Sequence, residues 1–333
     1  MPQDLAAAEA HLAPEVARAI EAGRVIEREV QRRTESSGAM KSSAKARDEY
    51  AALVEERAAA WEEYTKTATG GTPDLERMRA ITDRDAVIYA RQQALQVEMG
   101  AGSDARRAAL RDVLSEVREM GPGREGLELG DGKSGRAAKA MHAVSDLLPR
   151  SWFDEMNGWV RGSMDDPRAR LMHLLGRSNK PMKPGLRVRV AGRGHFSAQA
   201  REIVISEKPS AGSLPKGAST ALHEMVHWAE HSVPAIRRLE WAFYRSRTMT
   251  ADGYEATVRL RDRFPGSRYD ANEIARDDKW SNLYMGKDYG NGLDSSYEVM
   301  TMGVERAFAT DPLWMTDIDA EHLWFVIGML ALA

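Results

Sequence analysis

The chain has 333 residues and no cysteine, with 47 lysines and arginines against 50 aspartates and glutamates. Its formal net charge of −3 argues against a nucleic-acid-binding protein that works through bulk positive charge. Disulfides and thiolate metal sites are excluded, so any metal must be bound by His, Asp or Glu.

Neither end of the sequence predicts a membrane partner. Residues 1–5 lack the basic start and the apolar core of a secretory signal, so we expect no signal peptide. The longest apolar run, residues 323–333, is far shorter than the ~20 residues of a membrane-spanning helix. We expect this run to form a buried terminal helix.

Residues 1–120 predict a helical N-terminal region. Apolar residues recur with the period of a helix around residues 12–20, 50–64, 75–95 and 110–117. Breaks rich in glycine or serine are expected at 36–38, 70–73 and 100–103. The apolar stripes are thin and rich in alanine, which suits a coiled coil, a helical hairpin or docking to a partner. A solvated helical extension without chemistry is the simpler interpretation.

Residues 121–136 are rich in glycine and charge and predict a linker, which leaves a second domain at 137–333. The linker contains G-x-G-K-S, which is part of the phosphate-binding loop motif. The full motif needs a glycine five residues before Gly132, where Leu127 stands. We therefore reject a phosphate-binding loop.

Two short strands are predicted early in the second domain. Leu186, Val188 and Val190 alternate with arginines, which is typical of a half-buried strand, and residues 203–205 are all apolar. We expect an α+β, predominantly helical fold in which this strand pair precedes the central helix. Residues 201–206 would offer an edge along which an extended peptide can align.

The central helix carries the motif H-E-x-x-H. Its two histidines, His223 and His227, are four residues apart and therefore lie on one face of a helix. Two imidazoles so placed can bind one zinc ion, and Glu224 beside them can reach a water molecule on the metal. Pro234 is expected to end the helix. The helix's other face is apolar, at Leu222, Met225, Val226 and Ala229.

A catalytic zinc usually takes a third protein ligand, for which several residues are candidates. His231 lies two turns from His223, about 12 Å along the axis, which is too far for one ion. We favour Glu298, then Glu305, then Asp288, because a carboxylate is a suitable ligand. Glu298 has an alternative role, because Ser295 and Glu298 match a helix capping box.

With these residues, the chain resembles the zincin metallopeptidases, and its distant glutamate is similar to their gluzincin branch. Residues 284–290 and 296–305 look like putative zincin domains encoded by tailed phages and prophages, often in or beside minor head proteins. The resemblance covers about residues 185–333. It implies a zincin-like domain in which His223, His227 and Glu298 bind Zn²⁺.

The resemblance also implies a function and a setting. Zinc-dependent peptide-bond hydrolysis is expected, with Glu224 as the general base and a polypeptide as the substrate. Tyr284 or Tyr289 is a candidate donor to the developing oxyanion, although packing is the simpler role for both. The N-terminal helices would dock on phage structural proteins, in the host cytoplasm or the virion.

Two alternatives remain open from the sequence. The chain is a structural virion or assembly protein whose zinc site is not catalytic, or a toxin-like effector that acts on a host protein.

Overall fold

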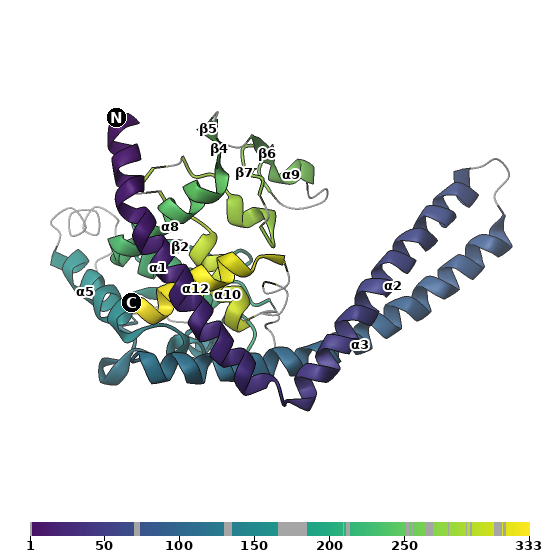
Figure 1. Ribbon diagram of the computed structural model, residues 1–333, viewed down its shortest axis with the longest axis horizontal. Coiled ribbons are helices and arrows are strands. Elements are labelled where there is room, and N and C mark those ends of the chain that lie inside the picture. Colours follow the sequence, from purple (N-terminus) through teal and green to yellow (C-terminus); the bar gives the residue numbers. More distant parts are fainter. Residues whose placement is uncertain are drawn as a thin grey trace, which may run out of the picture. The chain divides into compact units, whose positions relative to one another are not determined.

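The structure is a computed structural model (Figure 1). It describes residues 2–69, 74–129, 135–165, 185–208, 210, 214–250, 253–254, 256–263, 269–278, 280–290, 292–293, 295–309, 315 and 318–333. The G-x-G-K-S stretch and the break expected at 70–73 lie outside the described residues. The described chain is α+β and predominantly helical, which confirms the expected fold class.

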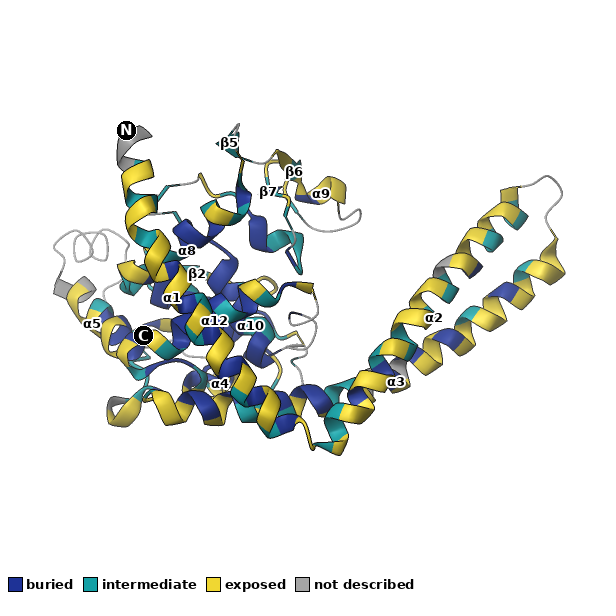
Figure 2. Ribbon diagram, viewed as in Figure 1, coloured by how far each residue is buried: buried dark blue, intermediate teal, exposed yellow. Residues whose placement is uncertain are grey.

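The chain forms two compact units that differ from the expected division at residues 120 and 136. One unit is Val30–Ala109, and the other combines Met1–Glu29 with Leu110–Ala333. Most of the first helix, α1 (Pro2–Thr34), therefore belongs with the C-terminal part of the chain. Figure 2 shows buried residues gathered among residues 110–333, whereas they are scattered along α2 and α3.

The unit Val30–Ala109 holds the end of α1 and a helical hairpin of α2 (Gly38–Thr69) and most of α3 (Leu75–Val117). The two helices of the hairpin are antiparallel and joined by side-chain ion pairs, namely Arg91–Glu49, Arg84–Glu56, Arg57–Asp85 and Arg77–Glu63. The expected break at 100–103 is wrong, because α3 continues through it. A Cβ at Gly102 would lie 2.4 Å from the Cβ of Ser43 in α2. Glycine here permits close helix packing instead of ending a helix.

The other unit contains a three-stranded sheet in the order β1-β3-β2. The two expected strands, β1 (Arg187–Val190) and β3 (Glu202–Ile205), pair with each other and are parallel. A third strand, β2 (His195–Ser197), is antiparallel to β3. The strand β3 is buried and paired on both sides. The expectation that residues 201–206 form a free edge is therefore wrong, and β1 and β2 are the edge strands of this sheet instead.

The helix α7 (Ala218–Ser232) is the centre of this unit. It packs against β3, α4 (Gly135–His142), α5 (Arg150–Asp165), α8 (Pro234–Thr248) and α10 (Val299–Ala309). The apolar face of α7 is fully buried, and α8 begins at Pro234 as its first residue. The remaining short elements are η1 (Gly123–Glu125), η2 (Ser145–Leu147), β4 (Met249–Thr250), β5 (Gly253–Tyr254), β6 (Thr257–Arg259), α9 (Leu260–Arg263), β7 (Ile274–Arg276) and η3 (Leu283–Gly286).

The last helix, α12 (Ala320–Leu332), crosses α1 at two glycines. A Cβ at Gly23 of α1 would lie 1.8 Å from the carbonyl oxygen of Trp324, and one at Gly328 would lie 1.7 Å from that of Ala19. Only glycine permits this contact between the two backbones. The expected buried terminal helix is confirmed, and no helix among the described residues is long and apolar enough to cross a bilayer.

We expect Gly328→Ala to lower the free energy of unfolding by about 1–3 kcal/mol, because the added methyl group forces α1 away from α12. Chemical denaturation measures this change. Gly158→Ala in α5 is the matched control, since a Cβ at Gly158 meets no atom within 4 Å. That control should be neutral or stabilising by about 0.5–1 kcal/mol. Equal stability of the two variants would contradict the close packing of α1 on α12.

Candidate metal centre

His223 and His227 lie one turn apart on α7, and both line a cavity. Their ring centroids are 5.0 Å apart, and their side chains are 14% and 15% exposed. The helix begins after Gly217, whose φ of 83° lies in the left-handed region. A Cβ there would meet the Cγ2 of Ile205 at 2.8 Å, so glycine permits α7 to start directly against β3.

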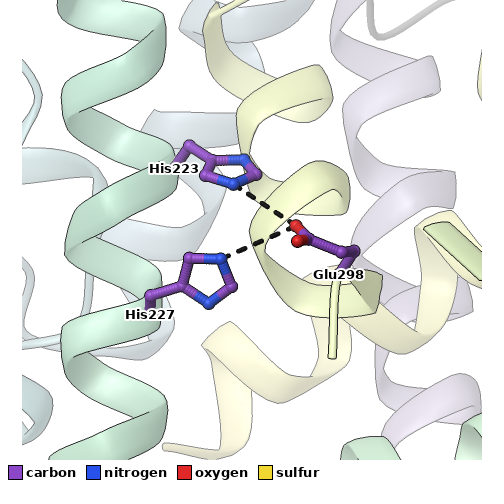
Figure 3. Close-up of side chains that lie close together, drawn as sticks. All are labelled: His223, His227 and Glu298. Carbon is purple, nitrogen blue, oxygen red and sulfur yellow. Dashed lines mark ion pairs between the residues drawn. The ribbon is translucent and has the colours of Figure 1, made fainter. Parts of the chain in front are cut away.

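Glu298 meets both histidines from the residue before α10 (Figure 3). Its Oε2 lies 3.3 Å from the Nε2 of His223 and 3.6 Å from the Nε2 of His227. The three possible ligand atoms lie within 4.8 Å of one another. The structure thus brings together the three residues that the sequence and the resemblance favoured as ligands.

The capping box suggested for Glu298 is not formed among the described contacts. The hydroxyl of Ser295 accepts a hydrogen bond from the amide of Gly292, and α10 begins only at Val299. Instead, the Glu298 carboxylate accepts hydrogen bonds from the hydroxyls of Tyr289 at 2.5 Å and Thr301 at 3.0 Å. These donors orient the carboxylate towards the histidines.

The other candidates for the third ligand occupy different positions. Glu305 lies 3.1 Å from the Nδ1 of His223, the ring nitrogen that faces away from Glu298, and accepts a hydrogen bond from Ser219. Asp288 forms an ion pair with Arg276 at 2.8 Å. His231 packs edge-on against Trp159, with ring centroids 5.0 Å apart. Glu298 therefore has the best geometry for a ligand.

Glu230 is a site residue that the sequence analysis missed. Its Oε2 lies 2.9 Å from the Nδ1 of His227, and its side chain is 2% exposed. Each histidine therefore has a carboxylate at its Nδ1, Glu305 for one and Glu230 for the other. An Nδ1–H that donates to a carboxylate leaves the Nε2 lone pair free for a metal. The three-residue spacing from His227 within one helix was the only available sequence signal.

The carboxylates also change the proton affinity of the two rings. Burial alone would lower the pKa of His223, but its hydrogen bonds with Glu298 and Glu305 raise it to about 10. Burial would also lower the pKa of His227. The neighbouring carboxylates of Glu230 and Glu298 outweigh burial and raise this pKa well above its usual value. Without metal, both rings therefore hold protons at neutral pH, and a metal must displace them.

Glu224 lies beside the histidines in a cavity of about 670 Å³. Its side chain is buried, and burial raises its pKa above the ordinary value. A Cβ at Gly194 would lie 2.9 Å from the Oε1 of Glu224 and 2.3 Å from the Cγ2 of Thr220. Glycine before β2 therefore leaves the space that the carboxylate of Glu224 occupies.

The residues fit a zinc ion by their chemistry. Two imidazole nitrogens and one carboxylate oxygen are a donor set that catalytic zinc commonly takes, and they converge from two separate elements. The carboxylates at the Nδ1 atoms complete an arrangement that is typical of metal-binding histidines.

We expect the apparent affinity for zinc to keep rising from about pH 6 to pH 9, by about tenfold per pH unit for each proton displaced. The reason is the raised pKa of both histidines, which makes protons compete with the metal throughout this range. Competition with a chelator of known affinity measures the effect. Ordinary histidines would give a plateau above about pH 7.5, and such a plateau would contradict the described site.

We expect Glu230→Gln to weaken zinc binding by about 10–100-fold, because His227 loses the charged acceptor that orients its ring. Glu202→Gln removes another buried carboxylate, one that pairs with Arg189 on the sheet, and serves as the control. Chelator competition at a fixed pH compares the two variants. Equal affinities would show that the carboxylate of Glu230 plays no part in metal binding.

Comparisons of the chain with protein-family models, with curated proteins and with solved structures find no match. The function of this chain is therefore inferred from the geometry of the metal site and from the sequence resemblance.

Proposed function

We propose that the chain is a zinc-dependent peptide hydrolase of the zincin type. The observation that carries this proposal is the convergence of His223, His227 and Glu298, with Glu224 buried beside them in the same cavity. The zincin type and the identity of zinc are supported by the H-E-x-x-H motif, by the donor set and by the sequence resemblance.

Each residue has a distinct role in this mechanism. A bound zinc ion would supply Lewis acidity, which acidifies a water molecule and polarises a peptide carbonyl. Glu224 takes the proton of the attacking water and passes it to the leaving amine. Its raised pKa suits this task, because a general base works best with a pKa near the operating pH. The hydroxyl of Tyr289 is engaged with Glu298, which supports an orienting role for this tyrosine.

The substrate would align along the edge strand β2. Residues 193–196 and Ala198 line the cavity, and β2 pairs with β3 on one side only among the described strands. An extended peptide can add to such an edge through main-chain hydrogen bonds. This position brings a peptide bond of the substrate to the metal group.

The proposed setting is a tailed phage, in the host cytoplasm or the virion. The sequence resemblance supports it, and the hairpin of α2 and α3 supports docking on phage structural proteins. Apolar side chains are exposed on this hairpin, at Val54, Trp61, Val87 and Tyr89.

A structural role of the metal is the second candidate. The ligands come from α7 and from the residue before α10, so a metal would link two elements of the core. A virion or assembly protein could use such a link for stability alone.

We expect Glu224→Gln to bind zinc like the parent protein and to lower kcat for peptide hydrolysis by about 10²–10⁴-fold, because it removes the general base. Cleavage of a peptide library by zinc-loaded protein measures this loss, with zinc content as the control. Equal cleavage by both proteins would exclude Glu224 as the base. A parent protein that cleaves nothing and unfolds when a chelator removes the metal would favour the structural role.

A further inference from the structure

One wall of the cavity is cationic. Arg193, which precedes β2, and Lys287, which follows η3, both line the cavity. Both also contact the same oxygen of Glu273, at 3.2 Å for the guanidinium and 2.7 Å for the ammonium group. The other oxygen of Glu273 accepts a hydrogen bond from the amide of Asp270 at 2.8 Å. One carboxylate thus pairs with two cations, and both of its oxygens have hydrogen-bond partners.

This wall carries a net positive charge at neutral pH. Burial opposes ionisation of Glu273, but the hydrogen bonds from Lys287, from the amide of Asp270 and from Arg193 together outweigh burial and lower its pKa. Burial likewise works against the charge of Lys287, but its interactions with Glu273 and Tyr284 together raise its pKa. Two cations and one anion leave one positive charge uncompensated within the cluster.

The neighbouring tyrosines do not cancel this charge. The Nζ of Lys287 lies 4.9 Å from the ring centroid of Tyr284 and 4.5 Å from that of Tyr289. Burial raises the pKa of both tyrosines, so both are neutral. The hydroxyl of Tyr289 donates to Glu298, which brings the cationic wall next to the metal group.

The acidic residues of the cavity lie at the metal group and not on the cationic wall. Among the described lining residues, the acidic ones are Glu224 and Glu298, which the proposed mechanism uses as base and ligand. Arg237 adds a further cation from α8. The chain as a whole has a formal net charge of −3. The excess positive charge is therefore local to the wall that Arg193 and Lys287 form.

We propose that Arg193 and Lys287 form a subsite for a carboxylate of the peptide substrate, close to the scissile bond. The inference rests on the proposed peptide hydrolysis and names its substrate class. The side chain of Arg193 is 63% exposed, so its planar guanidinium can meet a carboxylate from the cavity side. That carboxylate is an acidic side chain or the C-terminus of the peptide.

The experiment compares matched peptides that carry Glu or Gln near the cleavage site, each with a free or an amidated C-terminus. Hydrolysis is measured as kcat/KM, and binding is measured separately on the zinc-loaded Glu224→Gln protein. A preference for Glu in amidated peptides identifies a side-chain subsite. A preference for the free C-terminus, regardless of Glu or Gln, identifies a terminal carboxylate subsite.

Arg193→Gln should reduce the preference for the carboxylate by about tenfold, in hydrolysis and in binding. Arg187→Gln is the matched control, because its side chain is 61% exposed, contacts the buried Glu202 at 3.8 Å and lies outside the cavity lining. This control should keep the preference of the parent protein. Melting temperature and zinc content verify that both variants are folded and loaded.

The two proposals fail in different ways. Hydrolysis of all peptides without a carboxylate preference would overturn the subsite and leave the peptidase intact. A parent protein that cleaves nothing, while its zinc-loaded Glu224→Gln variant still binds the carboxylate peptides more tightly, would overturn hydrolysis and support the subsite. An equal loss of preference in Arg193→Gln and Arg187→Gln would also overturn the subsite.

Discussion

The site depends on two carboxylates that bind the Nδ1 atoms of its two histidine rings. Glu305 and Glu230 lie at 3.1 and 2.9 Å from the Nδ1 atoms of His223 and His227. Because each Nδ1 atom is paired with a carboxylate, each ring is oriented with its Nε2 atom towards Glu298. The i, i+4 spacing alone places two histidines on one face of a helix, but it does not orient their rings. The orientation comes from the carboxylates of Glu230 on α7 and Glu305 on α10.

The sequence predicted the part of the site that local spacing determines. The motif placed His223, Glu224 and His227 on one helix, and the type of ligand favoured Glu298 without excluding its rivals. Choosing among carboxylates required tertiary geometry, since Glu305 contacts the same ring as Glu298 from its other side. Glu230 was missed because its role depends on burial and on the rotamer of a neighbouring histidine, which no spacing encodes.

The fold shows a similar limit. Apolar periodicity predicted β1, β3 and the central helix, but it divided α3 into two helices. The strand β2 has three residues and no alternation of apolar and polar side chains. Its position in the sheet changed which strand can receive a peptide. Gly102 was interpreted as a break, whereas it permits close packing of α3 on Ser43. A glycine that bends the chain and one that permits helix contact look alike in a sequence.

The separation of the ligands along the chain has a consequence for biosynthesis. His223 and His227 leave the ribosome first, and another 70 residues (228–297) must be added before Glu298 follows. Until then, the histidine pair lacks its carboxylate ligand, and α10 is not present to supply Glu305. The nascent chain cannot assemble the full donor set during this interval, so any proteolytic activity begins only after most of the polypeptide has been translated.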